Sequence, residues 1–332
     1  MKNAKFGKIF ICVFIAVLSL SVGSPADCED YSKFPSRPIN YIVSLPPGST
    51  GDLVARFIGK AAEKYLGQPV VIVNKPGAGN TIGAAFLANS KPDGYTVGYA
   101  APTAMLVTPF LEKLPYDPLK SFRFIIQFSE APFAIIVKGD SPFKSFKDII
   151  ELARKNPDKL SYGTTGKISI VHLTMLQIAT KEKGLKLRQV AYRGGPETQA
   201  AILGGHIDFG VSDFNYTLVE AGQIRLLAML GEKRNPYYPN VPTLKELGYD
   251  RPEVPSAPIY HCIAVPKDVP DEIAAKLEKA FTQATKEPSF LNGLKDMRFQ
   301  VVYKNSKQFT EYMHYYYDYY GKLLKDMGLR KN

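Results

Sequence analysis

The chain has 332 residues, enough for two domains of ordinary size, and 45% of them are apolar, as in soluble globular proteins. Its formal net charge is +11, from 42 Lys and Arg against 31 Asp and Glu, but these charges are scattered and form no basic block. The composition therefore argues against a nucleic-acid-binding protein and favours one with a small anionic ligand.

Residues 1–26 have the pattern of a secretory signal peptide. Three lysines precede an apolar segment, 9–22, that is too short to span a bilayer, and small residues around Ala26 suit a cleavage site. We expect cleavage after Ala26 and a mature chain in the periplasm, with a retained membrane anchor as the alternative. Lipidation of Cys28 is disfavoured because Asp27 stands where a lipoprotein signal has a small residue.

The few cysteines and histidines show no metal-site pattern. Cys12 lies in the predicted signal peptide, and the remaining pair, Cys28 and Cys262, could form one disulfide in an oxidising compartment or stay unpaired, with the bond slightly favoured. The histidines are isolated from one another in the sequence: His172, His206, His261 and His314. We therefore expect no metal and no cofactor.

After the signal peptide, apolar strand patterns alternate with amphipathic helix patterns. The strands are predicted at 39–45, 70–73, 95–99, 124–128 and 133–137, and the helices at 53–66 and 81–89. This alternation predicts an α/β protein with a largely parallel sheet.

A second α/β cycle follows. It consists of helices at 146–156, 170–183 and 197–204 and strands at 160–162, 188–190 and 207–211. A strand at 223–230 could return to the first unit, and helices at 271–285 and 306–327 close the chain. We predict two lobes, with 27–135 and 228–332 forming a discontinuous first lobe and 136–227 forming the second.

Two glycine-bearing loops are the most informative local feature. Segments 39–61 and 69–90 each read as a β-branched strand, a Pro-Gly turn and then a helix. The first turn of a helix has backbone N–H groups without partners and the positive end of the helix dipole, and glycine lets a ligand approach closely. The two loops therefore predict a binding site for a carboxylate or phosphate.

Three other interpretations are weaker. The glycines at 77–83 resemble a dinucleotide-binding loop, but a proline precedes them and no acidic residue follows at the required place, and neither loop ends as a Walker motif does. Ser169 and His172 could form a catalytic pair, although a serine cap on a helix is the more common arrangement. Six tyrosines within 311–324 could form an aromatic ligand platform, but we expect them to pack against the first lobe.

Longer motifs then bring a family into view. They are FPSRPINYIVSLPPGSTGDLVARF, GQPVVIVNKPGAGNTIGAAFLANSKPDGYTVGYA, LPYDPLKSF, LSYGTTGKISIVHL, VAYRGGPETQAAILGGHIDFGVSD, GQIRLLA and PNVPTLKELGY. In this order, over about 34–328, the chain resembles the extracytoplasmic solute receptors of tripartite tricarboxylate transporters, the Bug-like family. The resemblance implies a two-lobed periplasmic binding protein (type II, Venus flytrap) with a ligand cleft between its lobes. It also implies a monomer that is not an enzyme, that closes on a small carboxylate and that delivers it to a membrane permease.

The resemblance also implies ligand-binding positions. In the first lobe, backbone amides and bridging water would hold a carboxylate at Gly48, Ser49, Thr50, Gly77, Ala78, Gly79 and Asn80, with Leu45 and Thr103 nearby. The matching positions in the second lobe are Thr165, Gly166, Ser169, Tyr192, Arg193 and Asp208. Asp52 matches an acidic position at the start of a helix, where it is at least as well explained as a cap.

Departures from the family pattern lie within these loops. The usual Gly-Gly pairs read Gly48-Ser49 and Gly79-Asn80, and asparagine tolerates a left-handed backbone better than serine does. Leu45 replaces a residue that is commonly aromatic. Ile168, beside Lys167, suits a carboxylate with an apolar or aromatic body better than citrate. A receptor that docks to an extracytoplasmic sensor domain for signalling is the alternative function.

Overall fold

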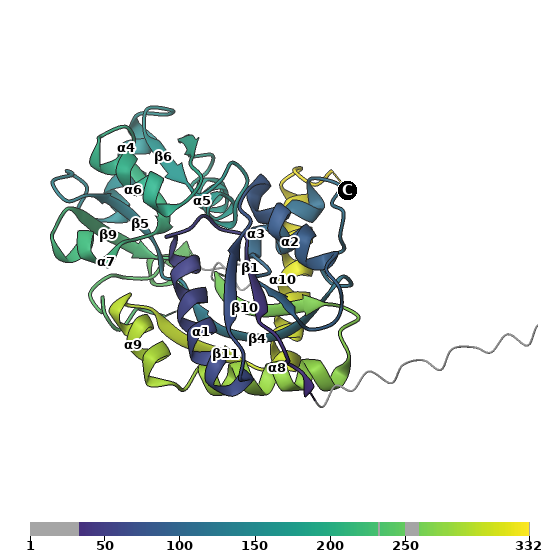
Figure 1. The fold of residues 1–332 in the computed structure, drawn as a ribbon. Coiled ribbons are helices and arrows are strands. Elements are labelled where there is room, and N and C mark those ends of the chain that lie inside the picture. Colours follow the sequence, from purple (N-terminus) through teal and green to yellow (C-terminus); the bar gives the residue numbers. More distant parts are fainter. Residues whose placement is uncertain (1–32, 232, 250–258, 332) are drawn as a thin grey trace, which may run out of the picture.

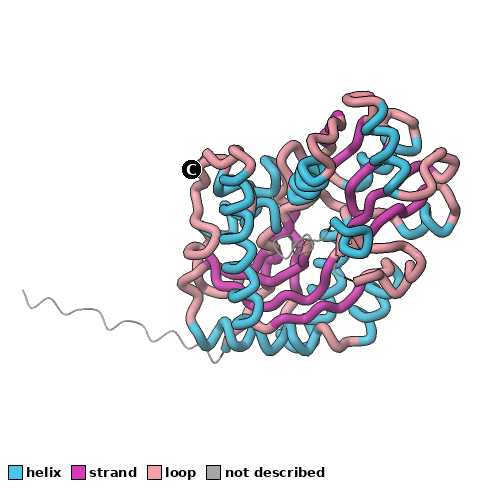
Figure 2. The backbone as a smooth tube through the Cα atoms, turned by 180° about the vertical axis from the view of Figure 1, so that it is seen from behind, coloured by secondary structure: helices cyan, strands magenta, loops and turns pink. Residues whose placement is uncertain are grey.

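The computed structural model describes residues 33–231, 233–249 and 259–331. Two lobes, each built on its own sheet, lie side by side (Figures 1 and 2). The predicted signal peptide and Cys28 lie outside the described residues, so its cleavage and the pairing of Cys28 with Cys262 stay predictions. No helix in the described part of the chain is long and apolar enough to cross a membrane.

The first lobe has a six-stranded sheet in the order β11-β4-β10-β3-β1-β2. Its strands are β1 (Ile39–Val43), β2 (Val70–Asn74), β3 (Thr96–Gly98), β4 (Phe122–Glu130), β10 (Tyr260–Pro266) and β11 (Gln300–Lys304). Its helices are α1 (Thr50–Leu66), α2 (Thr81–Ala88), α3 (Pro102–Leu106), α8 (Asp271–Ala284), α9 (Pro288–Asp296) and α10 (Ser306–Asp326), with short 3₁₀ turns η2 (Ala78–Asn80) and η3 (Thr108–Phe110).

The second lobe has a five-stranded sheet in the order β7-β6-β8-β5-β9. Its strands are β5 (Phe133–Lys138), β6 (Ser161–Thr164), β7 (Arg188–Ala191), β8 (Phe209–Asp213) and β9 (Ile224–Met229). Its helices are α4 (Phe146–Lys155), α5 (Ile170–Lys181), α6 (Gly195–Leu203) and α7 (Tyr216–Glu220), and a π-helical turn η4 (Lys245–Tyr249) follows β9.

The sequence explains where the main helices begin and end. Ser49 caps α1 by accepting the amide of Asp52, and Gly67 closes the helix in a left-handed conformation. α4 and α10 both start with reciprocal capping boxes, formed by Ser145 with Asp148 and by an asparagine–glutamine pair. These caps determine the residues at which α1, α4 and α10 begin.

Both sheets are mixed, which corrects the expectation of a largely parallel sheet. β1 pairs parallel with β2 and β3, but β10 runs antiparallel to β3 and β4, and β5 runs antiparallel to β8 and β9. The chain crosses from one lobe to the other along β4 and β5 and returns before β10, so these strands enter their sheets in the opposite direction.

The crossings also differ from the predicted lobe limits. β5 begins at Phe133 and β9 ends at Met229, so 133–135 and 228–229 lie in the second sheet rather than in the first lobe. The strand predicted at 223–230 likewise does not return to the first lobe, because β9 pairs with β5. β5 and β9 are each a continuous apolar strand, and one strand cannot be divided between two sheets.

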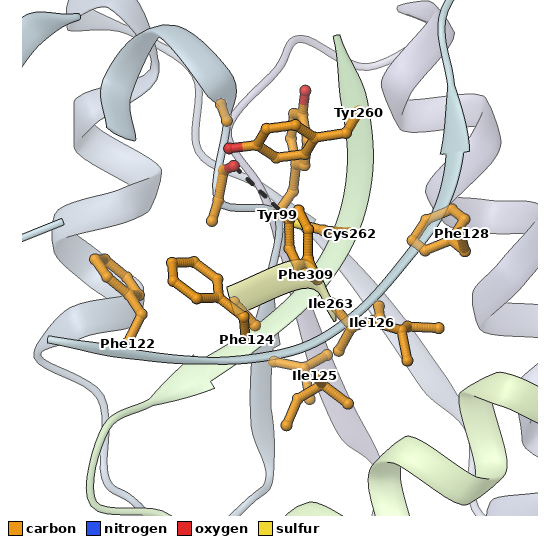
Figure 3. Close-up of a cluster of buried hydrophobic side chains, with 14 of the residues drawn as sticks. Tyr99, Phe122, Phe124, Ile125, Ile126, Phe128, Tyr260, Cys262, Ile263 and Phe309 are labelled. Atoms are coloured by element: carbon orange, nitrogen blue, oxygen red, sulfur yellow. Dashed lines mark hydrogen bonds between the residues drawn. The ribbon is translucent and has the colours of Figure 1, made fainter. Parts of the chain in front are cut away.

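The first lobe has a core rich in aromatic side chains (Figure 3). Phe122, Phe124 and Phe128 lie along β4, and Phe309 of α10 packs edge-on against Phe124 and Tyr260. Of the tyrosines on α10, Tyr316 and Tyr320 are buried in this core and others pack against it. These contacts support the packing interpretation of the tyrosine-rich segment.

Candidate functional site

The carboxyl ends of strands from both lobes lead into helix first turns at the junction between the lobes. In the first lobe, β1, β2 and β3 lead to α1, α2 and α3, and in the second lobe β6, β7 and β8 lead to α5, α6 and α7. Ile170 and Leu173, at the start of α5, are buried in the core cluster of the first lobe, so the two sets of helix starts face each other. In open α/β sheets this edge is where ligands bind.

Asp52 holds the first loop in shape. Its carboxylate accepts the amide of Gly48 at 2.9 Å, the side chain of Asn74 at 2.8 Å and two donors of Arg56 at 3.0 Å. Burial alone would raise the pKa of Asp52, but these hydrogen bonds outweigh it and keep the pKa below its ordinary value. Asp52 therefore organises the loop, whereas the cap of α1 is Ser49.

The serine in this loop leaves the backbone unstrained. Gly48 has φ +77°, whereas Ser49 has φ −68°, which any residue adopts. The Ser49 hydroxyl donates to the Pro46 carbonyl at 2.7 Å. Glycine is thus kept where the backbone requires it, and the first loop tolerates Ser49.

The second loop has four successive residues with positive φ. The values are 124° at Gly77, 45° at Ala78, 61° at Gly79 and 75° at Asn80. Asparagine is one of the few residues that enters this region readily, so the left-handed conformation expected at Asn80 is present. The Asn80 amide donates to the Gly77 carbonyl at 2.9 Å, which closes the turn.

Five backbone amides in these loops remain available for an anion. The amides of Thr50, Gly51, Gly77, Ala78 and Gly79 donate no hydrogen bond to any described residue. By contrast, the amides of Gly48, Ser49 and Asn80 are already occupied within the protein. The donors thus come from both loops, but from fewer positions than the sequence suggested.

In the second lobe, Gln189 of β7 shapes the loop before α5. Its side-chain amide donates to the Thr164 hydroxyl at 2.7 Å and to the Gly166 and Lys167 carbonyls at 3.2 and 3.0 Å. Gly166 has φ +121°, which favours glycine. Thr165 lies in this loop, and Ile168 is 38% exposed at its tip.

Ser169 and His172 do not form a catalytic pair. The Ser169 hydroxyl accepts the backbone amide of His172 at 3.4 Å as the cap of α5, while Nδ1 of His172 lies 2.9 Å from the Tyr162 hydroxyl. Burial lowers the pKa of His172. Within the described residues no group of three His, Cys, Asp or Glu side chains could hold a metal ion.

A single hydrogen bond joins the first turn of α1 to the end of β8. The Thr50 hydroxyl donates to Oδ2 of Asp213 at 2.8 Å. The carboxylate also lies against Gly195 at the start of α6, where a Cβ atom would overlap it. Asp213 therefore lies between helix starts of the two lobes, although sequence reasoning did not select it.

Beneath the first loop lies a second group of residues that the sequence did not reveal. His261 of β10 bonds through Nδ1 to the Ser129 hydroxyl at 2.7 Å, and its ring lies 5.8 Å from that of Tyr99. Burial lowers the pKa of His261 to about 3, so the ring is neutral. Leu45 covers the same region, because a Cβ atom at Gly51 would meet both Leu45 and His261.

The remaining predicted residues lie in different environments. Thr103 is in the first turn of α3, and Tyr192 packs against the core of the second lobe. Arg193 is exposed and pairs with Glu197. Asp208 lies before β8, where its carboxylate accepts the amide and hydroxyl of Ser161 at 2.7 Å each.

Asp208 is thus at the opposite end of the strand from the junction. It precedes β8, which spans Phe209–Asp213, and five residues of strand rise roughly 16 Å. The acidic side chain of this strand that reaches the first lobe is Asp213.

Sequence comparison identifies relatives over nearly the whole chain. The model of the tripartite tricarboxylate transporter family receptors matches residues 54–329. A UPF0065 protein in the gbd 5′ region of Cupriavidus necator is 36% identical over 91% of this chain and 90% of its own. Protein BugT of Bordetella pertussis is 26% identical over 83% of this chain and 84% of its own.

Solved structures share the fold. The periplasmic binding protein BugD is 29% identical, with a TM-score of 0.79 over 90% of this chain and 100% of its own. A protein of R. palustris solved with adipate is 26% identical, with a TM-score of 0.81 over 89% of this chain and 98% of its own. The two lobes described above are therefore those of a periplasmic binding protein.

Proposed function

Because this chain belongs to the family of tripartite tricarboxylate transporter receptors, we propose that it captures a small carboxylate between its lobes and delivers it to the membrane subunits of a transporter. The mature protein acts in the periplasm, after removal of residues 1–26. It is a binding protein that changes shape on ligand capture and performs no chemistry.

One observation carries the proposal. Free amides of two loops, Thr50 and Gly51 in one and Gly77, Ala78 and Gly79 in the other, lie at helix starts of one lobe. Such amides favour an anion through hydrogen bonds and through the positive end of the helix dipole. A carboxylate can be bound by donors from both loops without a metal or a nucleophile.

The surroundings favour an organic acid with an apolar body. Ile168 from the second lobe is 38% exposed, and Leu45 lies beside the first loop. The related R. palustris protein was solved with adipate, a carboxylate with an aliphatic chain. We extend this class of ligand, a carboxylate on an apolar chain or ring, to the present protein.

Thermal unfolding of the mature chain with mono-, di- and tricarboxylates tests the proposal. A ligand at a hundred times its Kd stabilises the folded state by about 2.7 kcal/mol, so the Tm rises by several degrees. The neutral amides of the same acids are the control ligands, and they should leave the Tm unchanged. Equal Tm values with every carboxylate and its amide would contradict a carboxylate site.

Gly79→Val tests whether the second loop holds the carboxylate. Gly79 has φ +61° and nothing within 4 Å of an added Cβ, so valine perturbs only the loop backbone, at a cost of about 1–2 kcal/mol. We expect the ligand-induced rise in Tm to disappear. Gly184→Val is the matched control, because Gly184 also has positive φ and open space but lies in a distant turn. Retained binding in Gly79→Val would exclude this loop.

A further inference from the structure

Asp213 is a buried carboxylate with few hydrogen-bond donors. It is 6% exposed, and within the described residues only the Thr50 hydroxyl and its own backbone amide donate to it. No described Lys or Arg forms an ion pair with it. A carboxylate has about four acceptor positions, and buried polar groups are normally satisfied, so acceptor capacity remains unused.

Asp52 provides the contrast within the same protein. It is also almost fully buried, but Gly48, Asn74 and Arg56 together supply it with four donors. Those contacts lower the pKa of Asp52, whereas burial raises the pKa of Asp213 and the Thr50 hydroxyl only partly opposes this effect. The acceptor positions of Asp52 are thus satisfied by donors within the protein, whereas those of Asp213 are not.

The position of Asp213 places its unused acceptors at the junction of the lobes. It ends β8, bonds to the first turn of α1 and touches Gly195 at the start of α6. The start of α6, which would otherwise attract a ligand anion, already has this carboxylate beside it. Arg193, the cation predicted to bind ligand in the second lobe, donates its guanidinium hydrogen bond to Glu197 instead.

From this arrangement we propose that Asp213 is a specificity-determining residue that accepts a hydrogen bond from a hydroxyl or amino group of the ligand. The inference rests on the proposed function, because it takes the ligand carboxylate to lie at the loops of the first lobe. Carboxylic acids with a hydroxyl or amino substituent are favoured, and a second ionised carboxylate at this point is repelled.

Matched acids that differ in one substituent test the proposal. Calorimetric titration of the mature protein would compare succinate with malate and aspartate, and phenylacetate with mandelate. Within each set that binds, we expect the hydroxy or amino acid to bind roughly tenfold tighter than the unsubstituted acid. This difference corresponds to the free energy of a hydrogen bond to a charged group. In Asp213→Asn this ratio should fall to within about threefold, because the neutral amide is a weaker acceptor.

Lys167→Gln is the control for a rival arrangement, in which the exposed Lys167 binds a second carboxylate. If Lys167→Gln abolishes binding of plain dicarboxylates and Asp213→Asn leaves every ratio unchanged, the proposal is wrong. A wild-type protein that binds the unsubstituted acids as tightly as the substituted ones also overturns it, whether or not Asp213→Asn folds. If no carboxylate binds the wild type, the proposed function itself fails, and this inference fails with it.

Discussion

Two acidic residues five positions apart in the sequence have different roles because β8 separates them. At one end of the strand, the Asp208 carboxylate accepts hydrogen bonds from Ser161. At the opposite end, the Asp213 carboxylate accepts one from Thr50 of the other lobe. The sequence predicts a strand there, but a strand pattern alone does not say which end meets the partner lobe. The signal that selects Asp213 is a polar residue at the last position of a buried apolar strand.

At the residue scale, His261 makes the stability of the protein depend on pH. Its pKa falls from 6.5 to about 3 on folding, so between these values the unfolded chain binds a proton that the folded protein does not. Protonation of His261 therefore does not lower the free energy of unfolding above pH 6.5. Below that pH the free energy of unfolding decreases, by up to roughly 5 kcal/mol near pH 3. Its neighbours Ser129, Tyr99, Phe128 and Phe299 carry no charge that could stabilise the protonated ring.

The measurement is urea unfolding of the wild type and His261→Gln between pH 4 and 7.5. The variant should lose less stability on acidification than the wild type. His314→Gln, which changes an exposed histidine on α10, should follow the wild type. Asp213 acts with the opposite sign, because its raised pKa makes the folded state bind the extra proton. Parallel curves for His261→Gln and wild type would refute this role of His261.

At the element scale, one side chain in the segment between α9 and β11 of the first lobe contacts the second lobe. Arg298 forms an ion pair with Glu220 at 2.7 Å and lies over the rings of Tyr216 and Tyr237, at 5.0 and 5.5 Å. Its carbonyl also accepts the side-chain amide of Asn235. These partners all belong to the second lobe or to the segment after β9.

We therefore expect Arg298→Ala to weaken ligand binding by increasing the dissociation rate. An exposed ion pair and cation–π contact contribute about 1 kcal/mol together, equivalent to about a fivefold change. Stopped-flow dissociation checks this. Arg37→Ala is the matched control, since Arg37 pairs with Asp93 and covers Tyr95 within a single lobe. Equal dissociation rates for the two variants would show that the Arg298 contacts do not hold the lobes together.

The elements differ in how well the sequence predicts them. α1 was predictable because its apolar residues recur at helical spacing between Ser49 and Gly67, both of which are caps. β10 was missed because all seven of its residues are buried, which leaves no alternation to recognise. The predicted limit of the second lobe, at residue 227, falls inside β9 because the partner of this strand, β5, lies almost ninety residues away in the sequence, and periodicity carries no information on pairing.

At the scale of the whole molecule, we expect maturation to remove residues 1–26. Mass spectrometry of protein from the periplasmic fraction should give the mass of a chain that begins at Asp27. The basic start and short apolar segment provide the physical reason, because they suit export better than membrane anchoring. An intact Met1, or an acyl group on Cys28, would contradict the prediction.

α5 belongs to both lobes of the molecule. Its residues Ile170 and Leu173 are buried in the core cluster of the first lobe, whereas Val171, Met175 and Ile178 are buried in that of the second. A movement of one lobe against the other must therefore change the surroundings of one side of this helix. Closure on a ligand consequently involves packed apolar contacts as well as polar ones.

The same helix makes the protein suited to an optical sensor. The Gln177 side chain on α5 donates to the Tyr319 hydroxyl on α10 at 2.9 Å, across the boundary between the lobes. The chain has 20 tyrosines and no tryptophan, so Tyr319→Trp would introduce a single indole fluorophore at this contact. Its emission would report lobe separation directly, without a dye, a labelled ligand or any background from other indole rings.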